Sequence, residues 1–166
     1  MALVISDSST LMHLARIGQI ALLRDLYGSL TIPPAVWREV VSEGKGRPGA
    51  NEVVAARQAG WLQVDKLADE SYLRLLSREL DVGEAEVLAL AIERAADLVL
   101  LDETEARRIA EVYGIAKTGV IGILIRARSE ARIGALRPLL DALREQGGFW
   151  IADDLYSRAL RSVGEA

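Results

Sequence analysis

The sequence contains no cysteine and only one histidine, His13. Without cysteine the chain has no disulfide framework, no thiolate metal site and no thiol nucleophile. One histidine can build neither a multi-histidine metal site nor the histidine pair of metal-free ribonucleases. A Gly-x-Ser-x-Gly nucleophile elbow is also missing. These absences exclude the common thiol-dependent and serine-dependent enzymes. His13 itself lies among apolar neighbours, and we expect it to have a packing or surface role.

Aromatic residues make up 5% of the chain, whereas hydrophobic residues make up 51% of its 166 residues. The core must therefore consist mainly of Leu, Val, Ile and Ala, and the length suits a single domain over residues 1–166. No apolar run approaches the roughly 20 residues of a membrane span. The N-terminal MALVISDSST has neither a basic segment nor a long apolar one. We expect no signal peptide, no contact with a membrane and a cytoplasmic location.

Short apolar runs alternate with helical patterns along the chain. Strands are predicted at LVIS (3–6), LTI (30–32), WLQV (61–64) and LVLL (98–101). The residues before Lys117 read as a short connection, and three helices are predicted after it, at 119–130, 135–146 and 153–163. Strands that alternate with helices are typical of βαβ units. We therefore predict an α/β fold of three layers, with a parallel sheet covered on both faces.

Two of the predicted strands end on an acid, because Asp7 follows LVIS and Asp102 follows LVLL. Open α/β sheets bind ligands beyond the carboxyl ends of their strands. On neighbouring strands, about 4.8 Å apart, the two carboxylates would repel unless a cation lay between them. Oxygen ligands of this kind suit a divalent metal ion. Helix capping is the alternative, since Asp7 can cap a helix from Ser8 and Asp102 forms a capping-box pattern with Glu105.

Two further acids can join such a site. Glu84 opens a strong helical pattern over 82–96, and Asp81 with Glu84 again matches a capping box. The helical wheel also places Glu84 on an otherwise apolar stripe, where a lone charge is costly. Glu39 lies one turn into the helix that starts at Pro34, and by itself it is typical of a surface glutamate.

The net charge of −4 argues mildly against a polyanionic partner, but the basic residues are concentrated in one stretch. From Arg107 to Arg137 there are seven basic residues and two acidic ones. This stretch is either a solvated helix face or a surface that attracts a polyanion. Within it, GVIGILIRA (119–127) favours core packing, with a dimer or partner interface as the alternative.

Six segments resemble PIN-domain nucleases, in family order, and especially a subgroup related to the VapC-like toxins of bacterial and archaeal toxin–antitoxin pairs. The segments are ISDSSTLMHLARIG, IPPAVWREV, LDVGEAEVLALA, LLDETEARRIA, KTGVIGILIRA and GGFWIADDLY, from residue 5 to about 156. The resemblance implies a PIN-like sheet of about five strands in the order 3-2-1-4-5. It also implies that the strands before Asp7 and Asp102 are neighbours. The part over 119–166 is a helical C-terminal extension relative to the simplest VapC toxins.

PIN domains of this kind carry four acidic residues that bind Mg²⁺ or Mn²⁺ and cleave RNA. The resemblance assigns metal binding and catalysis to Asp7, Glu39, Glu84 and Asp102. It places Ser9 where a small polar residue orients a ligand or a water. Arg107 falls in the subgroup's D-E-x-x-x-R stretch, where we expect it to contact a substrate phosphate. Glu103 is expected to face solvent.

The resemblance thus predicts a Mg²⁺- or Mn²⁺-dependent ribonuclease, a hydrolase that acts as the toxin of a type II toxin–antitoxin pair. Its expected partners are RNA, a small cognate antitoxin and a second copy of the chain in a homodimer. A catalytically silent PIN-like scaffold that binds protein or RNA is the alternative. A phosphotransfer enzyme of the haloacid-dehalogenase type is disfavoured. Its nucleophile loop usually needs an acid two residues after the first, where this chain has Ser9.

Overall fold

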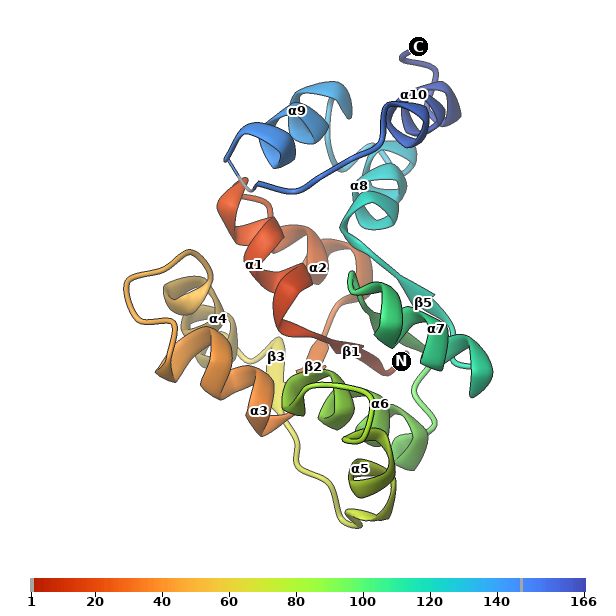
Figure 1. Cartoon of the computed structure of the whole chain (residues 1–166). Helices are drawn as coiled ribbons and strands as arrows, with labels where there is room; N and C mark the ends of the chain where they lie inside the picture. The colour runs from red at the N-terminus through yellow and green to blue at the C-terminus, as the bar shows by residue number, and fades with distance from the viewer. Residues whose placement is uncertain (1, 147) are drawn as a thin grey trace.

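A five-stranded parallel sheet lies at the centre of the computed structural model, which describes residues 2–146 and 148–166 (Figure 1). The strands are β1 (Val4–Ser6), β2 (Leu30–Ile32), β3 (Leu62–Val64), β4 (Leu98–Leu100) and β5 (Lys117–Thr118). They pair in the order β3-β2-β1-β4-β5, and every neighbouring pair is parallel. The predicted α/β fold and strand order are confirmed.

Helices cover both sides of this sheet. They are α1 (Ser8–Arg16), α2 (Ala21–Tyr27), α3 (Pro34–Trp37), the π-helix η1 (Arg38–Ser42), α4 (Ala50–Gln58), α5 (Ser71–Leu76), α6 (Val82–Arg94), α7 (Thr104–Val112), α8 (Val120–Ser129), α9 (Arg137–Gln146) and α10 (Asp153–Ser162). In Figure 1, α1 and α2 lie on one side of the strands, and α5 and α6 lie on the other. The predicted C-terminal helices are α8, α9 and α10, at the top of that view. Of the quoted segments, only Gly147 in GGFWIADDLY lies outside the described residues.

The core is aliphatic, as the composition requires. All residues of β1 and β2 are buried, so these strands are covered on both faces. In α6, Leu88 and Leu90 are fully buried, and in α8 so are Ile123 and Leu124. Burying each such side chain contributes about 1.5–3 kcal/mol. Core packing is therefore the role of one face of GVIGILIRA. No helix in the described part of the chain is long and apolar enough to cross a membrane.

Strands β1 and β4 are direct neighbours in the sheet. Ile5 is paired with Val99 and Ser6 with Leu100. The N–H of Asp7 extends this pairing by donating to the Leu100 carbonyl at 3.0 Å. The two loops that follow these strands therefore start side by side. This places Asp7 and Asp102 at the ends of neighbouring strands, where their carboxylates would repel each other without a cation.

Strand β5 lies where the hydrophobic pattern alone predicted only a short connection ending near Lys117. The strand has only two residues, both half-buried, and pairs with β4 at the sheet edge. The N–H of Leu101 also donates to the Thr118 carbonyl at 2.9 Å. A strand of two residues carries no measurable hydrophobic periodicity, so only the family resemblance indicated it.

The segment that carries Glu39 is fixed against α6. Pro34 occupies the first turn of α3, where its missing N–H costs no hydrogen bond. The next N–H, of Ala35, donates to Oε1 of Glu86 in α6 at 3.3 Å. The helix then widens into η1, which contains Glu39. Segments of π-helix often occur at functional sites, and here one brings Glu39 next to the start of α6.

Candidate active site

An acidic cavity of ≈ 260 Å³ lies where β1 and β4 end. Its lining consists of Asp7, Ser8, Ser9, Glu39, Asp81, Gly83, Glu84 and Glu103. Five of these residues are acidic, and no lysine or arginine from the described residues joins them. The acids come from four segments that are far apart in the sequence. The cavity therefore concentrates negative charge at the carboxyl edge of the sheet, where parallel α/β folds bind their ligands.

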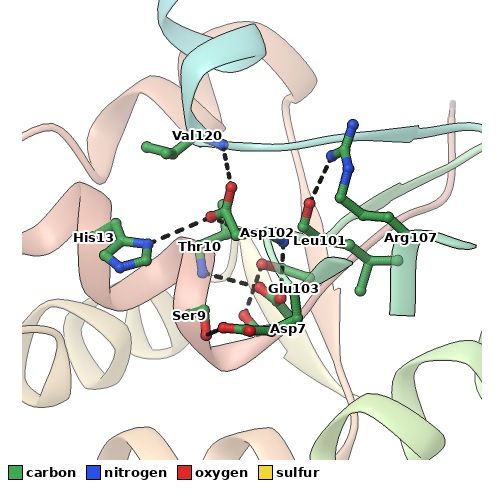
Figure 2. Close-up of polar contacts among 10 residues, drawn as sticks. Asp7, Ser9, Thr10, His13, Leu101, Asp102, Glu103, Arg107 and Val120 are labelled. Carbon is green, nitrogen blue, oxygen red and sulfur yellow. Dashed lines mark hydrogen bonds and ion pairs between the residues drawn. The ribbon is translucent and has the colours of Figure 1, made fainter. Parts of the chain in front are cut away.

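Asp7 is the most buried of these acids, with 3% of its surface exposed. Its Oδ1 accepts a hydrogen bond of 2.9 Å from the N–H of Thr10 and so caps α1, as the capping alternative predicted. Its Oδ2 accepts from the N–H of Asp102 at 3.3 Å (Figure 2). Burial, with the charge of Asp102 adding to it, raises the pKa of Asp7 from 3.8 to about 7 despite these hydrogen bonds. A buried carboxylate in this state favours a nearby cation.

Glu84 lies in the first turn of α6, and Asp81 is the N-cap of that helix. Oδ1 of Asp81 accepts from the N–H of Glu84 at 2.9 Å, so the predicted cap is present. Burial and then the neighbouring Asp81 raise the pKa of Glu84 to about 8. Burial and Asp81 also raise the pKa of Glu39. Capping and crowding of charge therefore occur together at this helix end.

Gly83 allows the carboxylate of Glu39 to approach α6. A Cβ at position 83 would lie 2.9 Å from Oε1 of Glu39 and 3.6 Å from Oδ1 of Asp81. The hydroxyl of Ser8 also lines this cavity. It is buried and makes no hydrogen bond of ordinary geometry, but it lies close enough to the Glu39 carboxylate to lower the pKa of that group. The Ser8 hydroxyl therefore belongs to the polar wall beside Glu39, where a ligand or a water can complete its hydrogen bonding.

The donor set of the cavity fits a divalent cation. Every charged group is a carboxylate, and hard ions such as Mg²⁺ and Mn²⁺ prefer oxygen ligands. The raised pKa values of Asp7 and Glu84 are those expected of carboxylates without a counter-charge. Among residues 2–146 and 148–166, however, no three acidic or histidine side chains are close enough to hold a metal ion as they stand.

Asp102 lines a different cavity from the one lined by Glu103. Its Oδ1 accepts from the N–H of Val120 at 2.9 Å, and its Oδ2 accepts from the hydroxyl of Thr10 at 2.9 Å. Nδ1 of His13 lies 3.4 Å from the same Oδ2 (Figure 2). The predicted capping of the next helix is wrong, because the N-cap of α7 is Glu103. Asp102 instead ties the β4–α7 loop to α1 and to the first residue of α8.

Glu103 is exposed, as predicted, but it also lines the acidic cavity. Its Oε1 accepts from the hydroxyl of Ser9 at 3.2 Å, which holds the side chain near Asp7 (Figure 2). Three of the four acids chosen from the sequence therefore line this cavity: Asp7, Glu39 and Glu84. Consecutive residues in extended chain point to opposite sides. The consecutive acids after β4 are therefore expected on opposite sides of the chain. The sequence does not show which of the two faces the acidic cavity.

The second cavity, of ≈ 380 Å³, lies between Asp102 and the C-terminal part of the chain. Arg107 and Lys117 line it, and Nη1 of Arg107 donates to the Leu101 carbonyl at 2.8 Å (Figure 2). Other arginines of the basic stretch pair with acids, as in Arg108–Glu105, Arg126–Glu130 and Arg128–Glu165. The basic stretch therefore does not form one continuous cationic surface. Two of its cations, Arg107 and Lys117, line the same cavity.

Comparison with known proteins agrees with this fold. The family model that matches the chain describes a PIN domain, and the match covers residues 3–165. No curated protein matches the sequence. PIN domains are typically nucleases that use divalent metal ions and bind RNA, and an acidic cavity at the sheet edge agrees with that chemistry. With nearly its whole length matched, the chain belongs to the PIN-domain family of nucleases.

Proposed function

We propose that the protein is a metal-dependent endoribonuclease that hydrolyses RNA phosphodiester bonds with Mg²⁺ or Mn²⁺. The acidic cavity carries this proposal. Buried Asp7, with its pKa raised to about 7, lines it together with Glu39, Glu84 and Glu103. No basic side chain in the described lining offsets these charges. A cation is therefore the natural counter-charge, and RNA is the substrate class that the family binds.

We assign Asp7, Glu39 and Glu84 as ligands of the ion. Asp102 is the fourth ligand proposed from the sequence, but the position of Glu103 on the cavity favours Glu103 for that role. Asp102, whose oxygens bind the Val120 N–H and the Thr10 hydroxyl, then acts as a positioning residue.

Several side chains of the protein have distinct roles in this proposed reaction. A divalent ion, when bound, lowers the pKa of a water and stabilises the charge that develops on the phosphate. Ser9 holds Glu103 on the cavity wall through its 3.2 Å hydrogen bond and is also the residue we propose to orient a ligand or water. Arg107 is proposed to contact a substrate phosphate. No protein nucleophile is needed for this hydrolysis, which agrees with a chain that lacks cysteine.

The deciding experiment is cleavage of a mixed RNA pool in Mn²⁺ and in Mg²⁺, with EDTA as the metal-free arm. Wild type should cleave only with metal, and Asp7→Asn and Glu84→Gln should lose cleavage while remaining folded. Glu105→Gln is the matched control, since Glu105 is an exposed acid of α7 paired with Arg108. If the control falls with the other two, the activity does not come from this cavity.

The alternative is a catalytically silent PIN-like scaffold that binds protein or RNA. The helix caps that Asp7 and Asp81 provide at α1 and α6 support it, because these acids then serve the fold. On that alternative, folded wild type saturated with metal binds RNA or a protein without cleaving any RNA of the pool. Calorimetry with Mn²⁺ separates failure to bind metal from failure to cleave.

We also propose that the whole chain, 1–166, acts in the cytoplasm as one PIN-like domain, as the toxin of a type II pair neutralised by a small antitoxin. The six segments that resemble VapC-like toxins support this role. Induced expression should arrest growth of a bacterial host, and co-expression of the small protein encoded beside it should restore growth. The proposed homodimer is tested by light scattering. A monomer at all concentrations would contradict it.

A further inference from the structure

The second cavity joins a cationic wall to an apolar one. Arg107 and Lys117 supply the charge, while Ile121, Ile125 and Phe149 supply apolar surface. A nucleotide has the same two-sided chemistry, with an anionic phosphate and a flat apolar base. The ≈ 380 Å³ of space is of the size that small-molecule pockets commonly have.

The cations of this cavity are available to a phosphate. Arg107 is fixed by the Leu101 carbonyl through Nη1. Nζ of Lys117 lies 3.2 Å from Glu111, whose side chain is 72% exposed. The Lys117 side chain itself is 17% exposed, and an ion pair whose acid is solvent-exposed is weak and can exchange for another anion. Asp102 also lines the cavity, but its carboxylate is 7% exposed and both oxygens already have partners. The lining keeps a net positive charge, because Arg107 and Lys117 outnumber Asp102.

Phe149 forms part of the apolar wall, and its ring packs against His13. Its ring makes an edge-on contact with His13, with the centroids 4.7 Å apart and the planes at 79°. His13 in turn lies against Asp102. A fixed aromatic ring beside aliphatic side chains is the kind of surface on which bases of single-stranded nucleic acids stack.

Both cavities border the same loop, because Asp102 lines one and Glu103 lines the other. One RNA strand that crosses this loop can therefore reach both. We propose that the second cavity is a subsite for one nucleotide of the RNA, next to the phosphodiester at the acidic cavity. Lys117 and Arg107 contact its phosphate, and Phe149 with Ile125 contacts its base. This subsite rests on the proposed ribonuclease function, and it assigns substrate contacts to Lys117 and Phe149.

The test is binding of a short, fluorescein-labelled single-stranded RNA in EDTA, followed by anisotropy over a series of KCl concentrations. EDTA separates binding from cleavage, so the result does not depend on whether the protein is a nuclease. Lys117→Gln keeps the side-chain stem and should weaken binding, with the slope of log K against log salt reduced by about 0.7. Phe149→Leu keeps apolar bulk and should weaken binding by about fivefold or more at an unchanged slope.

Matched controls exclude general effects of charge and of aromatic loss. Lys66→Gln makes the same change at an exposed lysine outside this cavity, and Tyr72→Leu removes an exposed aromatic ring from α5. Neither should change binding. If Lys117→Gln and Phe149→Leu also bind as wild type does, the subsite is wrong even where wild type cleaves RNA. If Lys117→Gln weakens RNA binding but Phe149→Leu does not, the cavity attracts phosphate without contacting a base. That result would overturn the nucleotide subsite.

A second measurement covers the case in which the short RNA binds too weakly. Titration with a nucleoside 5′-monophosphate should shift the backbone amide NMR signals of Gly119 and Gly122, which line the cavity. Equal shifts from inorganic phosphate alone would contradict a base contact, as would no shift from the nucleotide. Absence of metal-dependent cleavage with these shifts present would overturn the proposed catalysis and leave nucleotide binding standing.

Discussion

Asp102 and Glu103 are consecutive residues whose carboxylates serve opposite sides of one loop. Asp102 has its two oxygens engaged by the Val120 N–H and the Thr10 hydroxyl. Glu103 is held by the hydroxyl of Ser9 at the acidic cavity. The loop after β4 therefore presents one carboxylate that fastens helices together and one that is available to a cation.

Glu103→Gln is expected to raise the Mn²⁺ concentration needed for half-maximal cleavage by roughly tenfold or more, with little change in thermal stability. Asp102→Asn is expected to lower the free energy of unfolding by about 1–3 kcal/mol, because two buried donors lose a charged acceptor. Metal titration and urea unfolding in EDTA measure the two effects. The reverse result, with metal binding lost in Asp102→Asn at normal stability, would make Asp102 the fourth ligand.

The stability of the metal-free protein should fall as the pH rises. The folded-state pKa of Asp7 is about 7 against 3.8 for an ordinary Asp. Between these values the folded state holds a proton that the unfolded state has released, so stability decreases through that window and stays low above it. A difference of this size corresponds to about 4 kcal/mol at most. Glu84, with a pKa of about 8, acts in the same direction.

Urea unfolding in EDTA at a series of pH values checks this pH dependence. Asp7→Asn should flatten the fall, since asparagine also caps helices but does not titrate. Glu105→Gln should leave the fall unchanged. Mn²⁺ should stabilise wild type more above the pKa of Asp7 than below it. A wild-type stability that is constant or rises over this range would show that Asp7 is already compensated in the folded protein.

Gly83→Ala is expected to separate metal binding from stability. Its Cβ would lie 2.9 Å from Oε1 of Glu39, the far end of a flexible side chain that can move aside. Alanine also favours helices over glycine by about 1 kcal/mol. The variant should therefore unfold within about 1 kcal/mol of wild type but bind Mn²⁺ more weakly. Unchanged Mn²⁺ affinity by calorimetry would remove Glu39 from the ligand set.

Arg107→Ala is expected to weaken RNA binding and to lower its salt dependence by about 0.7 in the slope of log K against log salt. Arg108→Ala is the control, because Arg108 lies next to it on α7 but pairs with Glu105 and Glu79. Arg107→Lys should keep part of the affinity, since it keeps the charge. An unchanged salt slope in Arg107→Ala would contradict a phosphate contact at this position.

Much of the fold is predictable because its strands are apolar runs bounded by breakers. Strands β1 and β4 coincide with LVIS and LVLL to within a residue, and the C-terminal helices lie where their periodicity predicts them. Strand order does not follow from periodicity, since it depends on contacts between distant segments. The family resemblance supplied it, together with β5, whose two residues are too short for a pattern.

The candidate site is predictable in its acids and not in their orientation. Asp7, Glu39 and Glu84 meet at one cavity because strand ends and helix starts share an edge of the sheet. Which of Asp102 and Glu103 faces that cavity depends on the Val120 N–H, 18 residues away in α8. Similarly, no sequence pattern shows that the Glu86 carboxylate accepts the Ala35 N–H and so fixes the helix that precedes Glu39. Such pairings arise only after folding.

Because Asp7 caps α1, an acid at this position in a relative does not by itself indicate that catalysis is retained. Asp7 accepts the Thr10 N–H at the start of α1, so a relative that had lost all catalysis would still be under pressure to keep Asp, Asn or Ser there. Glu103 makes no side-chain cap at α7. Glu84 lies in the first turn of α6, and the side-chain cap of that helix comes from Asp81. Retention of acids at these two positions, rather than at Asp7, would therefore distinguish relatives that kept the chemistry from those that kept only the fold.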